Sequence, residues 1–211
     1  MPLLLKKYIF CLSLCLLVLG TSHAQQRFSA GLILGLNFSQ IDGDFYAGYH
    51  KVGLVGGLQG LVKIKEKVDV GIELRYSQIG SRSVPNNQNT INPFNASFNY
   101  AEIPVTLIYK DWHIEDEDYY RIHFHGGLTY GRLISTNIKN PESSSFTELL
   151  DFFNDNYFGY LVGFTYFINE KFGATVRFNR SITFLYKNDD TNPNHNSLFN
   201  KHLTFSGIYK F

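Results

Sequence analysis

The sequence predicts an all-β fold: an eight-stranded antiparallel up-and-down transmembrane β-barrel of the outer-membrane type. Apolar and polar residues alternate along segments of about ten residues, the connections between segments are alternately long and short, and aromatic residues gather at both segment ends. Outer-membrane barrels combine strands of this length, short periplasmic turns, long outer loops and two aromatic girdles.

Length and composition agree with one such domain. The chain has 211 residues, 44% of them hydrophobic, and is rich in Gly (18), Tyr (14) and Phe (19). Glycine allows close backbone approach and aromatic rings suit membrane interfaces, whereas good helix formers are not enriched. A formal net charge of +1 argues against a nucleic-acid partner.

The N-terminal segment 1–24 is predicted to be a signal peptide. Lys6 and Lys7 precede an apolar run, and small residues end the segment, so we expect the mature protein to begin at Gln25. Cys11 and Cys15 lie in this segment, so the mature chain has no cysteine. Residues 25–211 then form the barrel domain, which we expect in the outer membrane after cleavage. No later apolar run is long enough to cross a bilayer as a helix.

The segment 68–76 has the clearest strand pattern in the chain. Every second residue is apolar, and the residues between are charged or glycine. Successive side chains of a strand point to opposite faces, so this strand has one apolar and one charged face. A soluble sandwich would bury the apolar face, whereas a membrane barrel turns it to lipid and keeps charge in its lumen.

Seven other segments show the same alternation. In chain order, the eight predicted strands are 28–38, 52–64, 68–76, 100–109, 120–131, 158–168, 172–183 and 202–211. Tight or charged turns are predicted at 65–67, 110–118 and 169–171, and long connections at 39–51, 80–98, 134–156 and 186–200, with a short helix at 148–153. Pro104 would remove a ladder hydrogen bond, so we expect a bulge there.

The alternative fold is a soluble, calycin-like eight-stranded barrel. Its exterior would need charge on every strand, whereas the polar face here is mostly Gly, Ser, Thr and Asn, which suits the crowded interior of a narrow barrel. Rings also lie near both strand ends, among them Phe38, Tyr76, Tyr130, Tyr160 and Phe184 toward the long loops, and Phe28, Tyr109, Tyr120, Tyr166, Phe172 and Phe211 toward the short turns. In lipid the last strand must pair with the first, because open edges leave backbone groups unpaired.

Two features concern the membrane and its machinery. Arg180 lies on the face of its strand that is predicted to contact lipid. We therefore expect it near the outer surface of the membrane, where its side chain would snorkel or meet lipopolysaccharide phosphate. The C-terminal residues Leu203, Phe205, Tyr209 and Phe211 alternate and resemble the signal read by the barrel assembly machinery.

Three sequence stretches resemble the PorT-like outer-membrane β-barrel family of Bacteroidetes. They are 35–44 (GLNFSQIDGD), 48–53 (GYHKVG) and 100–104 (YAEIP). The resemblance implies an eight-stranded outer-membrane barrel over 25–211, and implies that Pro104 is a family feature. The family's namesake assists type IX secretion and gliding, whereas most relatives have no assigned activity.

The strongest polar cluster is predicted in the lumen, and consists of Glu73, Arg75, Glu102, Arg121 and Arg177. Asp69 and Lys63 are expected nearer the periplasmic end. Buried charges need partners, and opposite signs on neighbouring strands supply them. The cluster is therefore interpreted as a plug of ion pairs, with a gated ion path as the alternative.

Metal and catalytic sites have weaker support. His123 and His125 share a face, with His202 also expected inward, but histidines in a polar lumen are more often hydrogen-bonded structural groups. His50 and His195 lie in loops with nearby aspartates (Asp42, Asp44, Asp189 and Asp190), yet nothing fixes a nucleophile beside a base. We therefore predict no catalytic, metal or cofactor site.

The predicted function is that of a monomeric, non-enzymatic outer-membrane barrel with a plugged lumen. Its expected contacts are membrane lipid, lipopolysaccharide, the assembly machinery and a protein partner at the long loops, with the aromatic segments 94–98 and 146–153 as contact surface. A narrow channel for ions or small solutes is the main alternative, followed by a rim-loop enzyme.

Overall fold

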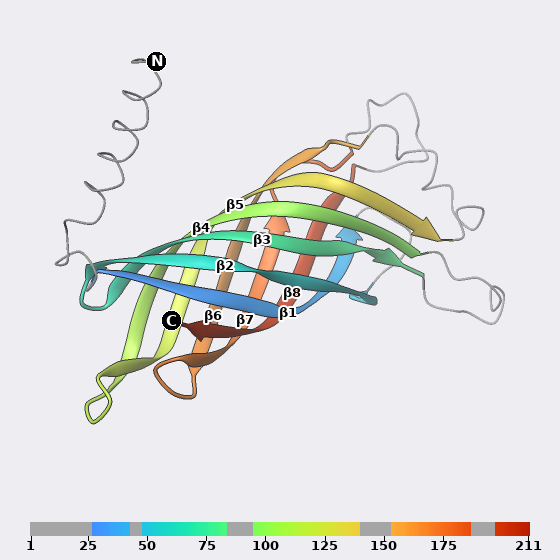
Figure 1. The fold of residues 1–211 in the computed structure, drawn as a ribbon. Helices are drawn as coiled ribbons and strands as arrows, with labels where there is room; N and C mark the ends of the chain where they lie inside the picture. The colour runs from blue at the N-terminus through green and yellow to red at the C-terminus, as the bar shows by residue number, and fades with distance from the viewer. Residues whose placement is uncertain (1–26, 43–47, 84–94, 140–152, 187–196) are drawn as a thin grey trace, which may run out of the picture.

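The computed structural model of the chain is a closed barrel of eight antiparallel strands (Figure 1). It describes residues 27–42, 48–83, 95–139, 153–186 and 197–211. The strands are β1 (Phe28–Asp42), β2 (Lys51–Lys65), β3 (Val68–Arg82), β4 (Asn95–Ile114), β5 (Tyr119–Lys139), β6 (Asn156–Phe167), β7 (Phe172–Ser181) and β8 (Phe199–Lys210). The predicted fold class is confirmed.

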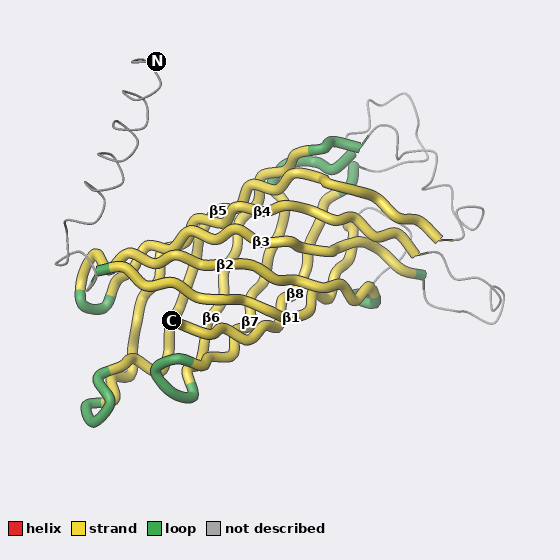
Figure 2. Tube along the Cα trace, in the orientation of Figure 1, coloured by secondary structure: helices red, strands yellow, loops and turns green. Residues whose placement is uncertain are grey.

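Each strand pairs with its neighbours in sequence, and β8 closes the sheet by pairing with β1. In this seam Leu36 lies opposite Phe205 and Gly31 lies opposite Lys210. Closure leaves no strand edge with unpaired backbone groups, as the hydrocarbon of a membrane requires. The tube trace in Figure 2 shows the strands as one continuous tilted wall.

Several strands are longer than predicted. The strand β3 continues to Arg82, and β4 runs over 20 residues from Asn95 to Ile114, so segments predicted as loop or turn belong to the sheet. The strand β5 has 21 residues and extends to Lys139. These extensions lengthen the wall mainly at the end of the long connections.

Pro104 does not cause the predicted bulge. The β3–β4 register is the same at Ile72–Val105 and at Arg75–Glu102, but the residues between, including Pro104, are not paired across this ladder. Pro104 lacks an N–H and so leaves a gap in the ladder without shifting it. The register shift of β4 lies instead at Asn99/Tyr100, in its pairing with β5.

The outer wall is apolar along its whole circumference. The predicted outward residues of the strands are exposed, with Leu34, Leu74 and Leu128 at 69%, 60% and 64%. Such a band on a closed barrel suits contact with lipid. Among the described residues, no helix is long and apolar enough to span a membrane.

The interior is layered along the barrel axis. An apolar cluster lies toward the long connections and contains Ile41, Ile79, Ala96, Phe98, Tyr100, Tyr157, Leu185 and Leu198. A smaller one toward the short turns contains Ile33, Tyr119, Phe167 and Ile208. The lumen is therefore not uniformly polar, because apolar layers lie on both sides of its charged groups.

Some predictions lie wholly or largely outside the described residues, namely the signal peptide at 1–24, the loop histidine His195 and the helix at 148–153. The proposed contact surface at 94–98 is wrong at Phe98, which is 1% exposed. The Phe98 ring stacks on Phe153 at a centroid distance of 5.2 Å. Both rings belong to the interior packing rather than to a displayed loop.

Candidate functional site

Four charged side chains meet in the barrel interior. Glu73 and Arg75 come from β3, Glu102 from β4 and Arg177 from β7, and none is more than 5% exposed. Strand periodicity turns all four inward, since each lies between two outward apolar residues. We call these four residues the charged layer.

The longest-range contact of the charged layer joins β7 to β3. The Nη1 and Nη2 atoms of Arg177 donate to the two carboxylate oxygens of Glu73 at 2.8 and 2.9 Å. Gln59 on β2 donates to the same carboxylate at 3.0 Å. A bidentate pair of this kind fixes geometry as well as supplying energy.

The second pair lies beside the first. Arg75 Nε donates to Glu102 at 2.6 Å, and Arg75 Nη2 donates to Asn179 on β7 at 3.2 Å. Arg75 Nη1 also lies 3.6 Å from Glu73, which links the two pairs. The Tyr157 hydroxyl on β6 donates to the other oxygen of Glu102. The layer therefore holds two buried cations against two buried anions.

Neutral side chains continue this network to the β8–β1 seam. Asn179 donates to Thr204 on β8 at 3.2 Å, Thr204 donates to Asn37 on β1 at 2.7 Å, and Asn37 donates to Ser77 on β3 at 2.8 Å. Among the described residues, side chains from every strand except β5 thus join one network of hydrogen bonds and ion pairs across the lumen.

Glycines on the neighbouring strands make room for the charged layer. Gly57 lies opposite Arg75, and a Cβ at Gly57 would come within 2.5 Å of the Arg75 Cβ. Gly131 lies opposite both Glu102 and Tyr157, and its Cβ would come within 2.1 Å of the Tyr157 ring. The small residues of the inward face are therefore required by specific large partners.

Arg121 does not join the charged layer, contrary to the prediction. Its guanidinium donates to the Tyr119 hydroxyl at 3.2 Å and lies 5.3 Å from the Trp112 ring centroid and 6.0 Å from that of Tyr166. It follows Tyr119 and Tyr120 at the short-turn start of β5, whereas the charged layer lies farther along the barrel. The alternation predicts that the Arg121 side chain points inward, but it does not predict how far along the barrel axis the residue lies.

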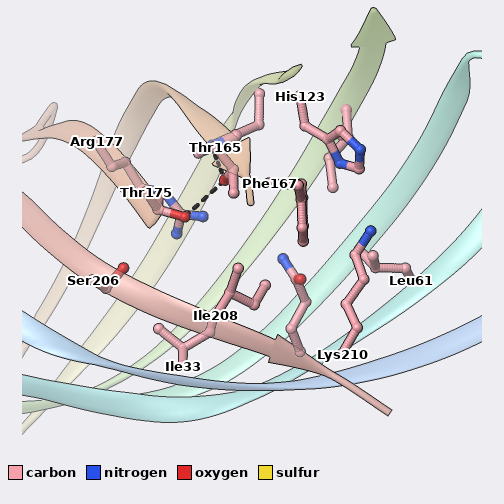
Figure 3. Close-up of a pocket in the computed structure, with 13 residues that line it drawn as sticks. Ile33, Leu61, His123, Thr165, Phe167, Thr175, Arg177, Ser206, Ile208 and Lys210 are labelled. Carbon is pink, nitrogen blue, oxygen red and sulfur yellow. Dashed lines mark hydrogen bonds between the residues drawn. The ribbon is translucent and has the colours of Figure 1, made fainter. Parts of the chain in front are cut away.

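The charged layer rests on a small cavity of about 20 Å³ toward the short turns (Figure 3). Arg177 and His125 line it, and Thr165 and Thr175 form a 2.7 Å hydrogen bond in its wall. In the described part of the chain, Arg177 Nε and His125 Nδ1 have no hydrogen-bond partner. A cavity of this size holds about one water molecule, which could satisfy such groups.

The inward histidines make separate contacts. His123 Nε2 lies 3.1 Å from the Tyr120 carbonyl oxygen, and His125 Nε2 lies 3.2 Å from the Thr165 hydroxyl. His202 faces inward and is 1% exposed. In the described ranges, no three His, Cys, Asp or Glu side chains come together as a metal site.

The outer end of the wall carries an exposed charge cluster. Arg180 Nη2 lies 3.8 Å from an Asp42 carboxylate oxygen, and Lys201 pairs with the same carboxylate. Arg180 points outward near the long connections, the position that its sequence phase predicts. Asp42, which was predicted to lie in a loop, is the last residue of β1 and pairs with Lys201. Asp44, Asp189 and Asp190 lie outside the described residues.

The C-terminal residues lie on the outer face of β8. Phe205 and Phe211 are 47% and 71% exposed. The Tyr209 ring lies 4.7 Å from Phe172 and 5.5 Å from Phe211 between centroids. Leu203 lies opposite Phe38 of β1 and Phe178 of β7. The four residues predicted as an assembly signal thus form an apolar stripe along the closing strand.

Sequence reasoning missed the neutral partners of the charged layer. Tyr157 lies one residue before the predicted strand, yet it has the inward phase of Gly159 and Leu161. Asn37 and Asn179 belong to the polar faces of the predicted strands 28–38 and 172–183, and both are buried in the barrel. Extending the alternation by one residue and pairing inward amides with inward arginines would have found them.

Solved outer-membrane barrels resemble this structure weakly. Ail of Yersinia pestis matches with a TM-score of 0.48 and 12% identity, over 88% of this chain and 99% of that chain. Neisserial surface protein A matches with a TM-score of 0.44 and 10% identity, over 87% and 97%. OprG of Pseudomonas aeruginosa matches with a TM-score of 0.39 and 13% identity, over 88% and 97%. No curated protein matches.

The sequence itself gives the stronger result. The family model described as outer membrane protein beta-barrel domain matches residues 11–211. This match includes every strand of the barrel. The chain therefore belongs to the outer membrane protein β-barrel family.

Proposed function

We propose that this protein is a non-enzymatic outer-membrane barrel whose lumen is closed by the charged layer, and that it acts as a structural element or as a platform for a partner at its long loops. The carrying observation is the bidentate Arg177–Glu73 pair, which links opposite parts of the wall across the lumen. The Arg75–Glu102 pair fills the space beside it.

Closure is favoured by the energetics of these contacts. An ion passing through the lumen would have to separate buried charges that satisfy one another, and leaving one buried charge unpaired costs about 3–5 kcal/mol. The apolar cluster that contains Phe98 and Tyr157 adds a second barrier on the side of the long connections. Both features favour a rigid barrel over a channel.

The proposed role as a platform rests on the lengths of the connections between strands, which are alternately long and short. The strand ends that the long connections join all lie at one end of the barrel, which faces outward in barrels of this kind. Loops on a rigid scaffold are where binding residues usually lie. A protein partner, lipopolysaccharide near Arg180 and a monomeric state are parts of this proposal.

A more specific assignment rests on sequence resemblance alone. The stretches at 35–44, 48–53 and 100–104 support a PorT-like barrel, and through the family's namesake a link to type IX secretion or gliding. Affinity purification from native membranes, with and without residues 143–153, tests both ideas. Co-purification of secretion components that depends on this loop would support the link, and their absence from both samples would contradict it.

Conductance of the reconstituted protein tests the plug. We expect wild-type protein in planar bilayers to show no steady conductance, whereas Arg177→Ala opens the lumen enough for measurable current. Arg121→Ala is the matched control, because Arg121 lies outside the charged layer, and it should stay silent. Steady conductance in the wild type would favour the alternative function of a narrow ion channel.

A further inference from the structure

A cavity of about 510 Å³ opens at the short-turn end of the barrel. This end faces the periplasm in outer-membrane barrels. Four cationic side chains line the cavity, namely Arg27, Lys63, Lys110 and Lys210. Its volume falls in the range of about 300–1,000 Å³ that is typical of small-molecule sites.

The carboxylates of this cavity already have partners. Asp69 accepts a hydrogen bond from Lys110 at 2.8 Å. Asp118 lies 2.9 Å from His113 Nε2. Glu66 accepts a hydrogen bond from the Tyr120 hydroxyl at 3.1 Å. Asp69 also lies opposite Lys63 across the β2–β3 ladder, so this one carboxylate faces both Lys110 and Lys63.

The remaining cations are Arg27, Lys63 and Lys210. None of them forms an ion pair within the part of the chain that the structure describes. Lys210 is the most enclosed, with its Nζ 3.9 Å from the centroid of the Phe167 ring. A ring face attracts a cation but leaves its hydrogen-bond donors free for an anion.

Lys210 and His123 also form the inner end of the cavity. Both residues line the large cavity and the small one beneath the charged layer. Figure 3 shows His123, Phe167 and Lys210 among the side chains that line the small cavity. Lys210 and His123 therefore lie at the boundary between a cavity of about 510 Å³ and one of about 20 Å³.

The wall of the cavity supplies aromatic surface as well as charge. Phe28, Tyr119 and Tyr120 line it beside the lysines. Lysine acts as a point charge toward phosphate, and rings add apolar contact for the rest of a ligand. We propose that this cavity binds a phosphate monoester that carries an aromatic or apolar group, with the phosphate at Lys210 and Lys63. This site is separate from the charged layer, so it does not depend on the plug.

The proposal is tested by calorimetric titration of the full-length, folded protein in a non-ionic detergent. Phenyl phosphate represents a soluble ligand, dihexanoyl phosphatidic acid represents a lipid headgroup, and phenol is the uncharged comparison. We expect saturable binding of a phosphate probe and none of phenol. Binding of phenyl phosphate identifies a soluble source, whereas binding of the lipid alone identifies a headgroup.

Matched variants locate the binding. Lys210→Gln and Lys63→Gln should each weaken binding about tenfold, as loss of one charged hydrogen bond does. Lys210→Arg should retain binding, which separates a lost charge from a folding defect. Lys171→Gln removes a lysine at the same barrel end but outside the cavity, and should change nothing. No saturable binding of either probe, or wild-type affinity in Lys210→Gln, would overturn the proposal.

Discussion

Removal of Arg177 should destabilise the barrel strongly, because it unbalances the charged layer. Glu73 would lose two short charged hydrogen bonds and keep only Gln59 at 3.0 Å and the more distant Arg75 at 3.6 Å. Each charged hydrogen bond contributes about 1.5–3 kcal/mol, and breaking a buried pair costs about 3–5 kcal/mol. We expect Arg177→Met to lower the free energy of unfolding by about 3–5 kcal/mol.

A second substitution should restore much of this loss. In Glu73→Gln/Arg177→Met the charged layer keeps only the balanced pair of Arg75 and Glu102, so none of its charges is left unpaired. The coupling between the two sites should then reach about 2–3 kcal/mol, near the upper end for contacting residues. The control Arg121→Met, which loses exposed ring contacts, should change stability by about 0.5–1 kcal/mol.

The measurement is urea unfolding in phospholipid vesicles. Trp112 is the only tryptophan of the chain and reports unfolding by its emission, and heat-dependent gel mobility gives an independent signal for the Arg121 control. If Arg177→Met is as stable as wild type, or if the double variant is no more stable than Arg177→Met, the charge-balance reasoning is refuted.

Three further substitutions and one control variant test the wall and the closing strand. Gly131→Ala should destabilise the barrel by about 1–3 kcal/mol, because its Cβ would meet the Tyr157 ring at 2.1 Å, whereas Gly126→Ala, with its nearest atom at 3.8 Å, should be tolerated. Leu34→Arg, on a side chain that is 69% exposed, should cost about 2–4 kcal/mol in vesicles, because lipid rather than water surrounds it. Phe211→Ser should lower the fraction of protein that reaches the folded state in cells, as measured by heat-dependent gel mobility.

Each of these expectations has a clear opposite result. Equal stability of the two alanine variants would mean that the wall near Tyr157 relaxes freely. A neutral Leu34→Arg would mean that the apolar wall is not lipid-facing. Wild-type assembly of Phe211→Ser, compared with Phe28→Ser at the same barrel end, would remove the C-terminal residue from the assembly signal.

The alternation predicted the fold because every strand of a membrane barrel turns one face to lipid and the other to the lumen, so apolar residues recur at every second position. The alternation in 68–76 reappears as the exposed and buried faces of β3. The extra strand length of β4 was missed where Asp111, Trp112 and His113 lose the alternation. Outside the hydrocarbon layer, water accepts either residue type, so the sequence no longer marks the strand.

The charged layer was predicted only in part. The alternation along a strand predicts which face of the sheet a side chain lies on, and it correctly placed Glu73, Arg75, Glu102 and Arg177 on the inward face. It does not give the position along the barrel axis, which depends on the stagger between strands, and Arg121 was misplaced for that reason. The interior apolar clusters were missed because they draw on residues such as Phe98 and Leu185 that lay outside the predicted strands.

The pairing of Arg177 with Glu73 also constrains the order of assembly. The two residues are separated by 104 positions, so their contact closes a very long loop of chain. Contacts of this range form late, since the entropy of ordering the intervening chain must be overcome first. A nascent wall that contains β3 but not yet β7 would carry Glu73 without its main partner, so that carboxylate would keep its contact with water or Gln59 until the last strands arrive.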